Sequence, residues 1–161
     1  MVEDARFEDA GGQPLRLQAL DQKDIEVISS LVQDAVFPIT EMSWSATKRR
    51  FGLLLNRFRW EDRDDAQKQH RKFERVQSML VVNDVQKVSS NGIDRGDKDL
   101  ILSVLAISFV PVEDGAGRVE LTLAGDGVIA LSVECLDISL ADVTRPYIAP
   151  SRTAPDHNQE G

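Results

Sequence analysis

The sequence predicts an α+β domain: a mainly antiparallel β roll or half-open barrel of about seven strands, with one N-terminal helix packed on it. Three observations lead to this prediction. One stretch near the start has apolar residues at helical spacing, whereas later segments alternate apolar and polar residues as strands do. The links between these segments are short, which favours antiparallel neighbours. A twisted sheet of this size tends to curl.

The predicted helix spans residues 21–35. Asp21 is a suitable N-cap, and Asp24 stands where an acidic side chain supports the first helical turn. Phe37 precedes Pro38, and a residue before proline disfavours the helical region, so we expect the helix to end before it. Its apolar stripe consists of Ile25, Ile28, Leu31, Val32 and Ala35. Because such a short helix is marginal alone, we expect it to cover the sheet.

The strand pattern gives one clear hairpin and two changes of face. Gly125-Asp126-Gly127 separates two cleanly alternating segments, which predicts the hairpin. The apolar face changes near Asn56 and again after Cys135, which predicts a bulge or bend at each place. The plan is loosely similar to pleckstrin-homology-like folds, whose helix normally comes last. The predicted strands span residues 39–45, 50–60, 73–82, 85–89, 100–110, 118–124 and 128–136.

The length of 161 residues suits one domain, which we place at residues 15–148 with a charged loop at 61–72. Residues 1–14 are expected to be mobile and residues 149–161 to be a disordered tail. The acidic start lacks the basic and apolar parts of a signal peptide. The longest apolar-rich run is shorter than the roughly 20 residues of a membrane span. These features predict a cytoplasmic protein without a membrane partner.

Composition excludes several classes of site. A net charge of −8 argues against non-specific binding of nucleic acid by the whole molecule. Residues 48–75, with 10 basic and 5 acidic side chains, are the only segment suited to it. One cysteine excludes a disulfide framework, and two histidines leave little for zinc, so we predict no metal and no cofactor. Cys135 lies among apolar residues and is expected to be a buried structural thiol.

No catalytic constellation stands out. Residues 125–130 match a dinucleotide-binding pattern, but a β-branched strand follows where that loop needs a helix. The sequence lacks the P-loop, the zinc-protease motif and the nucleophile elbow. We therefore predict no catalytic residue.

The most distinctive stretch is residues 55–62, where two arginines flank an aromatic residue. Guanidinium groups bind carboxylates or phosphates and stack on rings, which indicates a surface for an anion or a protein. Alternatively, these arginines pair with acidic side chains on neighbouring strands, which the acidic composition favours. The predicted binding residues are Asn56, Arg57, Arg59 and Trp60, joined by Asp94, Arg95 and Arg145 if their loops converge.

Four segments in one order resemble an uncharacterised bacterial family, domain of unknown function 2948. They are residues 55–61, 92–95, 102–107 and 140–146, and the resemblance covers about residues 15–147. Residues 62–71 are extra length relative to the family pattern. The family carries no known reaction, so the resemblance implies no catalytic residue.

The sequence favours a small cytoplasmic binding or accessory module that recognises a protein or an anionic ligand through its arginine and aromatic surface. One alternative is an enzyme acting on an anionic metabolite, in which Asp94 or Asp142 would face Arg57 or Arg59 across a pocket. Another is a homodimer that pairs through an exposed sheet edge.

Overall fold

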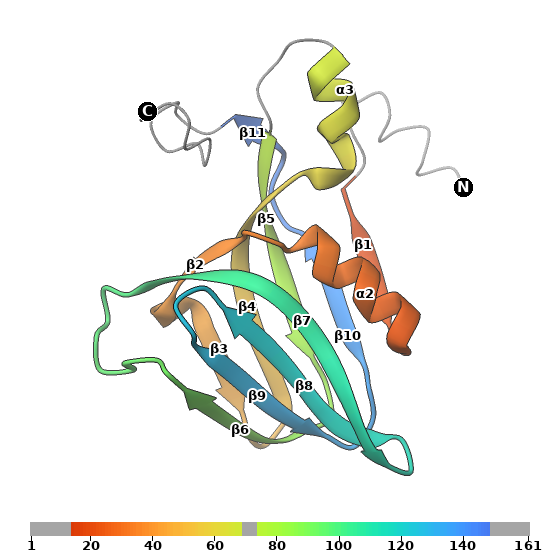
Figure 1. Ribbon diagram of the computed structural model, residues 1–161, viewed down its shortest axis with the longest axis vertical. Coiled ribbons are helices and arrows are strands. Elements are labelled where there is room, and N and C mark those ends of the chain that lie inside the picture. Colours follow the sequence, from red (N-terminus) through yellow and green to blue (C-terminus); the bar gives the residue numbers. More distant parts are fainter. Residues whose placement is uncertain (1–13, 69–73, 149–161) are drawn as a thin grey trace.

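The computed structural model describes residues 14–68 and 74–148 (Figure 1). The predicted mobile start and disordered tail fall outside these ranges, except for Pro14. Within them lie one longer helix near the start of the chain and a large curved sheet (Figure 1).

The helix α2 (Gln22–Leu31) begins as predicted. The carboxylate of the N-cap Asp21 accepts the backbone N–H of Asp24 at 2.9 Å. The helix ends earlier than expected, because Asp34 and Ala35 exchange backbone hydrogen bonds of 2.8 Å with Val104 of the sheet. Asp34 has a φ of 65°, which the helix cannot accommodate. The chain thus leaves the helix at Leu31 in order to pair with a strand.

Eleven strands among the described residues form one antiparallel sheet in the order β1-β10-β5-β4-β2-β7-β8-β9-β6, with β3 on β4 and β11 on β5. The sheet is open and does not close into a barrel, since its path ends at β1 and β6. Their bounds are β1 (Arg16–Ala19), β2 (Val36–Pro38), β3 (Met42–Ser45), β4 (Arg50–Phe58), β5 (Glu74–Val82), β6 (Val85–Asn91), β7 (Ile101–Glu113), β8 (Ala116–Leu123), β9 (Val128–Val133), β10 (Ile138–Asp142) and β11 (Tyr147–Ile148).

The prediction of about seven strands is therefore wrong in number. Strands β1, β2 and β11 have only two to four residues, too few for a period-two pattern to register. The bend after Cys135 is confirmed, because β9 ends at Val133 and β10 begins at Ile138 between β1 and β5. The bend exposes Cys135, so the prediction of a buried thiol is wrong. Its thiol donates to the Asp84 carboxylate at 3.2 Å.

The second predicted change of face, near Asn56, does not occur. Strand β4 pairs with β5 in continuous register from Phe51 to Phe58. Phe51, Leu53 and Leu55 point into the core, and Arg57 occupies the next inward position on the same face. An arginine therefore stands where the alternation calls for an apolar residue.

Helix α2 lies across the inner side of the sheet between β1 and β7 (Figure 1). Its own residues Ile25 and Ile28 are buried. The hydroxyl of Ser29, also in the helix, accepts the backbone N–H of Ile107 in β7 at 3.0 Å. This covers part of the β7 edge, which pairs with β2 only at its start. The helix thus closes the core where the sheet leaves it open.

The segment expected to be a charged loop, residues 61–72, contains helical structure over its described part. A 3-10 turn, η2 (Trp60–Asp62), leads into the short helix α3 (Arg63–Lys68). Ala66 is buried, and Ala, Gln, Lys and Arg are good helix formers. A second 3-10 turn, η1 (Ile39–Glu41), joins β2 to β3.

Candidate functional site

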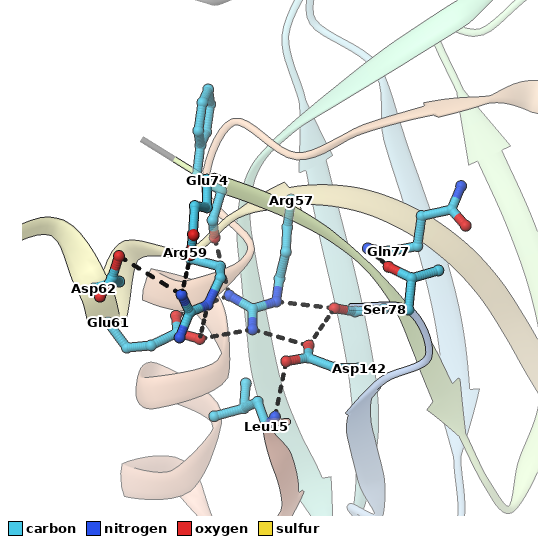
Figure 2. A network of polar contacts seen from close by, with 11 residues as sticks. Leu15, Arg57, Arg59, Glu61, Asp62, Glu74, Gln77, Ser78 and Asp142 are labelled. Atoms are coloured by element: carbon cyan, nitrogen blue, oxygen red, sulfur yellow. Dashed lines mark hydrogen bonds and ion pairs between the residues drawn. The ribbon is translucent and has the colours of Figure 1, made fainter. Parts of the chain in front are cut away.

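Arg57 is fully buried on the inner face of β4, and all five of its N–H groups have acceptors (Figure 2). Its Nε donates to the Ser78 hydroxyl at 2.9 Å. Its Nη1 donates to the Phe58 carbonyl at 2.9 Å and to Glu61 Oε1 at 3.0 Å. Its Nη2 donates to Glu61 Oε2 and to Asp142 Oδ1, each at 2.9 Å. No donor of Arg57 is left for a ligand.

Asp142 is the buried carboxylate of this network, with 2% of its side chain exposed. Its Oδ1 also accepts the Ser78 hydroxyl at 2.7 Å, and its Oδ2 accepts the backbone N–H of Leu15 at 2.7 Å. Burial acts to lower the pKa of Arg57, but Glu61 and Asp142 outweigh it and raise that pKa. The network ties β4, β5, β10 and the segment before β1 together (Figure 2).

Arg59 is also held inside the protein. It forms ion pairs with Glu74, with Asp62 at 3.6 Å and with Glu61 at 3.9 Å. Its backbone N–H donates to the Glu74 carbonyl at 2.9 Å. The interpretation of the two predicted arginines as partners of nearby acids is therefore confirmed for both.

The opposite face of the same two strands carries a different arginine. Arg75 of β5 is only 7% exposed, and its guanidinium carbon lies 4.2 Å from the centre of the Phe58 ring. Its Nη1 donates to Asn56 Oδ1 at 3.1 Å. The Asn56 amide in turn donates to the Tyr147 hydroxyl at 2.7 Å. An amide, a ring and a phenol thus surround this guanidinium.

Arg75 has no ion pair with any side chain that the structure describes. Its Nε and Nη2 make no hydrogen bond with the residues that the structure describes. Burial lowers the pKa of Arg75, an effect that Tyr147 partly opposes. This cation is largely removed from water, and no described side chain places a negative charge beside it.

A groove of about 300 Å³ opens on this outer face next to Asn56. It follows the line where β2 leaves β4, since the two strands pair only at Val36 and Asn56. Five of its eight lining residues are apolar, and an acid and two amides complete the lining. The lining residues are Val36, Pro38, Glu41, Leu54, Leu55, Asn56, Gln77 and Ile101.

A family model described as a protein of unknown function, DUF2948, matches residues 15–157. The chain belongs to this family. The match confirms the resemblance carried by the four sequence segments, and it assigns no reaction to any residue. No curated protein and no solved structure matches the chain.

Two absences concern the part of the chain that the structure describes. None of its helices is long and apolar enough to cross a membrane. Its histidine, cysteine, aspartate and glutamate side chains form no group of three or more that could hold a metal ion.

The structure of this DUF2948 member places the predicted site residues in separate parts of the fold. Asn56 lines the groove. The centre of the Trp60 ring lies 5.2 Å from the centre of the Phe58 ring. The Trp60 indole N–H donates to the Gln33 carbonyl at 2.9 Å. Arg145 is exposed in the link before Tyr147. Ligand binding at these residues stays a prediction.

Asp94 and Arg95 lie elsewhere, in the exposed link between β6 and β7. The Asp94 carboxylate accepts the backbone N–H of Gly96 at 3.0 Å. The neighbouring Gly92 packs against the turn at Asp126, between β8 and β9. No contact within the described chain joins these loop residues to the two predicted arginines, so Asp94 and Arg95 lie apart from the other predicted site residues.

The geometry required by the enzyme hypothesis is also absent at Asp142. Its carboxylate contacts Arg57 directly, and no space for a substrate separates the two described side chains. The sequence reasoning missed Arg75 and Tyr147. Both stand on outward positions where a polar residue is ordinary, and the pairing of β11 with β5 that brings them together spans more than 70 residues.

Proposed function

We propose that the protein is a binding module whose ligand presents an anionic group to Arg75 on the outer face of β4 and β5. The observation that carries the proposal is the nearly buried Arg75 guanidinium without an ion-pair partner among the described residues. A buried charge is costly unless an opposite charge or good hydrogen bonds compensate it. A bound anion would supply that compensation.

The groups beside Arg75 support binding in preference to proton transfer. Asn56 and Gln77 carry amides, Phe58 carries a ring, and Tyr147 carries a phenol. Amides and aromatic faces orient a ligand, whereas acid–base catalysis near neutral pH requires a group that titrates there. This refines the arginine and aromatic surface expected from the sequence, with Arg75 in the place given to Arg57 and Arg59.

The test is thermal unfolding of the full chain in sodium acetate or sodium phosphate, compared with sodium chloride at equal ionic strength. A ligand at ten times its Kd adds about 1.4 kcal/mol to the free energy of unfolding, so Tm should rise with anion concentration. We expect a larger rise in the native protein than in Arg75→Met, because phosphate and acetate also stabilise folded proteins through exclusion from their surface.

Arg50→Met is the matched control, because Arg50 is an exposed arginine on β4. Among the described residues, its side chain makes one hydrogen bond, to Asn83 at 3.3 Å. This variant should keep the rise in Tm. An equal rise in Arg75→Met, or no rise in the native protein, overturns the proposal.

A further inference from the structure

Two charges of opposite sign, Arg75 and Glu41, lie on the outer side of the sheet, which faces away from helix α2. Neither forms an ion pair with a side chain that the structure describes. We infer that two copies of the chain associate through this outer side, related by a half-turn, with Glu41 of each copy on Arg75 of the other. This inference rests on the proposed function, because it names the ligand that presents the negative charge to Arg75.

The outer side of the central strands is poor in charge. It consists of the outward positions of β2, β4, β5 and β10, and none of these described positions carries an acidic residue. Its middle is formed by four half-buried apolar residues, Leu54, Met79, Val81 and Ala141. The whole chain has 27 acidic residues and a net charge of −8, so two copies repel each other where their acids meet. A surface without acids, depleted in charge as interface cores are, lets two copies approach.

The positions of Arg75 and Glu41 fit a half-turn about Asn56 of β4. Arg75 lies on β5, to one side of β4, opposite Phe58, which comes two residues after Asn56. Glu41 directly precedes β3, which lies on the other side of β4 and begins opposite Leu53, three residues before Asn56. A half-turn about an axis through Asn56, perpendicular to the sheet, therefore carries each charge close to the position of the other. A two-fold interface requires this reciprocity.

A second pair of positions obeys the same half-turn. Ile101 lies two strands from β4, because it pairs with Pro38, two residues beyond the point where β2 pairs with Asn56. Tyr147 lies two strands from β4 in the opposite direction, because it pairs with Arg75. Ile101 is 58% exposed and Tyr147 is 38% exposed. In the associated pair each would cover the other and remove apolar surface from water.

The extent of the outer side predicts a weak association. Strands β4 and β5 have nine residues each, with β2 and β10 beside them. At about 4.8 Å between strands and about 3.3 Å per residue, this surface covers roughly 600 Å² per copy. A standard interface covers roughly 800 Å² per partner, so this contact stands at the lower end for specific interfaces. We therefore expect monomers at about 1 μM and dimers at hundreds of micromolar.

The experiment is sedimentation velocity of the full chain between about 1 and 300 μM, which follows the change from monomer to dimer. Glu41→Lys places a cation against Arg75 of the other copy, so the dimer Kd should rise at least about tenfold. Glu113→Lys is the matched control, because Glu113 is an equally exposed acid at the far end of β7, away from these strands. It should not weaken the dimer.

Ile101→Ser tests the apolar contact. Because each dimer contains this residue twice, the dimer Kd should rise about tenfold. Val112→Ser is the matched control, because Val112 is 66% exposed on the same strand and lies well beyond its pairing with β2. It should leave the Kd unchanged.

A mixing experiment tests the reciprocity of the two charges. Glu41→Lys and Arg75→Glu should each fail to associate alone, because each places like charges together. An equal mixture of the two should associate, since the mixed dimer holds one native and one reversed ion pair. Circular dichroism checks that Arg75→Glu folds. If it does not fold, the comparison of Glu41→Lys with Glu113→Lys decides.

The outcomes separate this inference from the proposed function. A chain that stays monomeric up to about 300 μM leaves the outer side to a different partner and overturns the inference. A dimer that Glu41→Lys and Ile101→Ser both leave intact also overturns it. The thermal test of the proposed function belongs at about 1 μM, where the chain is monomeric and Arg75 is open to free anions. Absence of the Arg75-dependent rise in Tm there overturns the proposed function, whatever the association state.

Discussion

Arg57 and Arg75 lie on neighbouring strands of one sheet, on opposite faces, and both are almost completely removed from solvent. Arg57 gives all five N–H groups to acceptors, among them two carboxylates. Arg75 gives one hydrogen bond to an amide and lies on an aromatic ring. Burial is nearly equal, and the set of partners differs. That difference separates Arg57, which links elements of the fold, from Arg75, which we propose as the ligand site.

The energetic consequence is asymmetric. Removal of one partner from a buried ion pair leaves the other charge uncompensated, which is costly. Loss of a buried cation that has no ionic partner leaves no such charge behind. The same substitution at the two arginines should therefore affect stability very differently.

The largest effect is expected for Arg57→Met. The Asp142 carboxylate would stay buried without its cation, so the free energy of unfolding should fall by about 3–5 kcal/mol. Urea denaturation at neutral pH measures it. Arg50→Met, at the exposed start of the same strand, should change it by no more than about 0.5 kcal/mol. Arg57→Met/Asp142→Leu removes both charges and should recover part of the loss. A loss below about 1 kcal/mol in Arg57→Met would contradict the conclusion that the ion pairs of Arg57 stabilise the fold.

An intermediate effect is expected for Ser78→Ala. The Ser78 hydroxyl accepts from Arg57 and donates to Asp142. Its removal leaves the buried Nε–H of Arg57 without an acceptor and takes from Asp142 Oδ1 one of its two hydrogen bonds. The cost should be about 1–3 kcal/mol by urea denaturation. Gln77 is the adjacent residue on β5 and points away from the network (Figure 2). Gln77→Ala should cost no more than about 0.5 kcal/mol, and equal costs at the two positions would refute the difference between the faces.

Local patterns in the sequence predicted much of the fold. The N-cap at Asp21 and the helical stripe placed α2, and the turn at Gly125-Asp126-Gly127 placed the hairpin of β8 and β9. Both signals come from residues close together in the chain. The short strands β2 and β11 left no recognisable signal in the sequence, because β2 pairs with β7 and β11 pairs with β5, and these partners are distant in sequence.

The site was harder to predict, because period-two patterning assumes that a charged residue faces solvent. Arg57 violates that assumption, and the apparent change of face at Asn56 was its result. The partner that allows Arg57 to be buried, Asp142, is 85 residues away. Arg75 gave no signal, since it stands on an outward position where arginine is common. Neither position can be assigned without the register of β4, β5 and β10.

The smallest effect on stability is expected for Arg75→Met, and it bears most directly on function. The hydrogen bond to Asn56 and the contact with the Phe58 ring each contribute about 1 kcal/mol. The desolvation of the guanidinium opposes both, so the free energy of unfolding should change by no more than about 1 kcal/mol. Urea denaturation of the ligand-free protein, beside Arg57→Met, checks this. A fall in the free energy of unfolding as large as that of Arg57→Met would mean that Arg75, like Arg57, serves to stabilise the fold. A small loss means that stability does not account for a buried cation at this position, which leaves recognition of an anion as the reason for it.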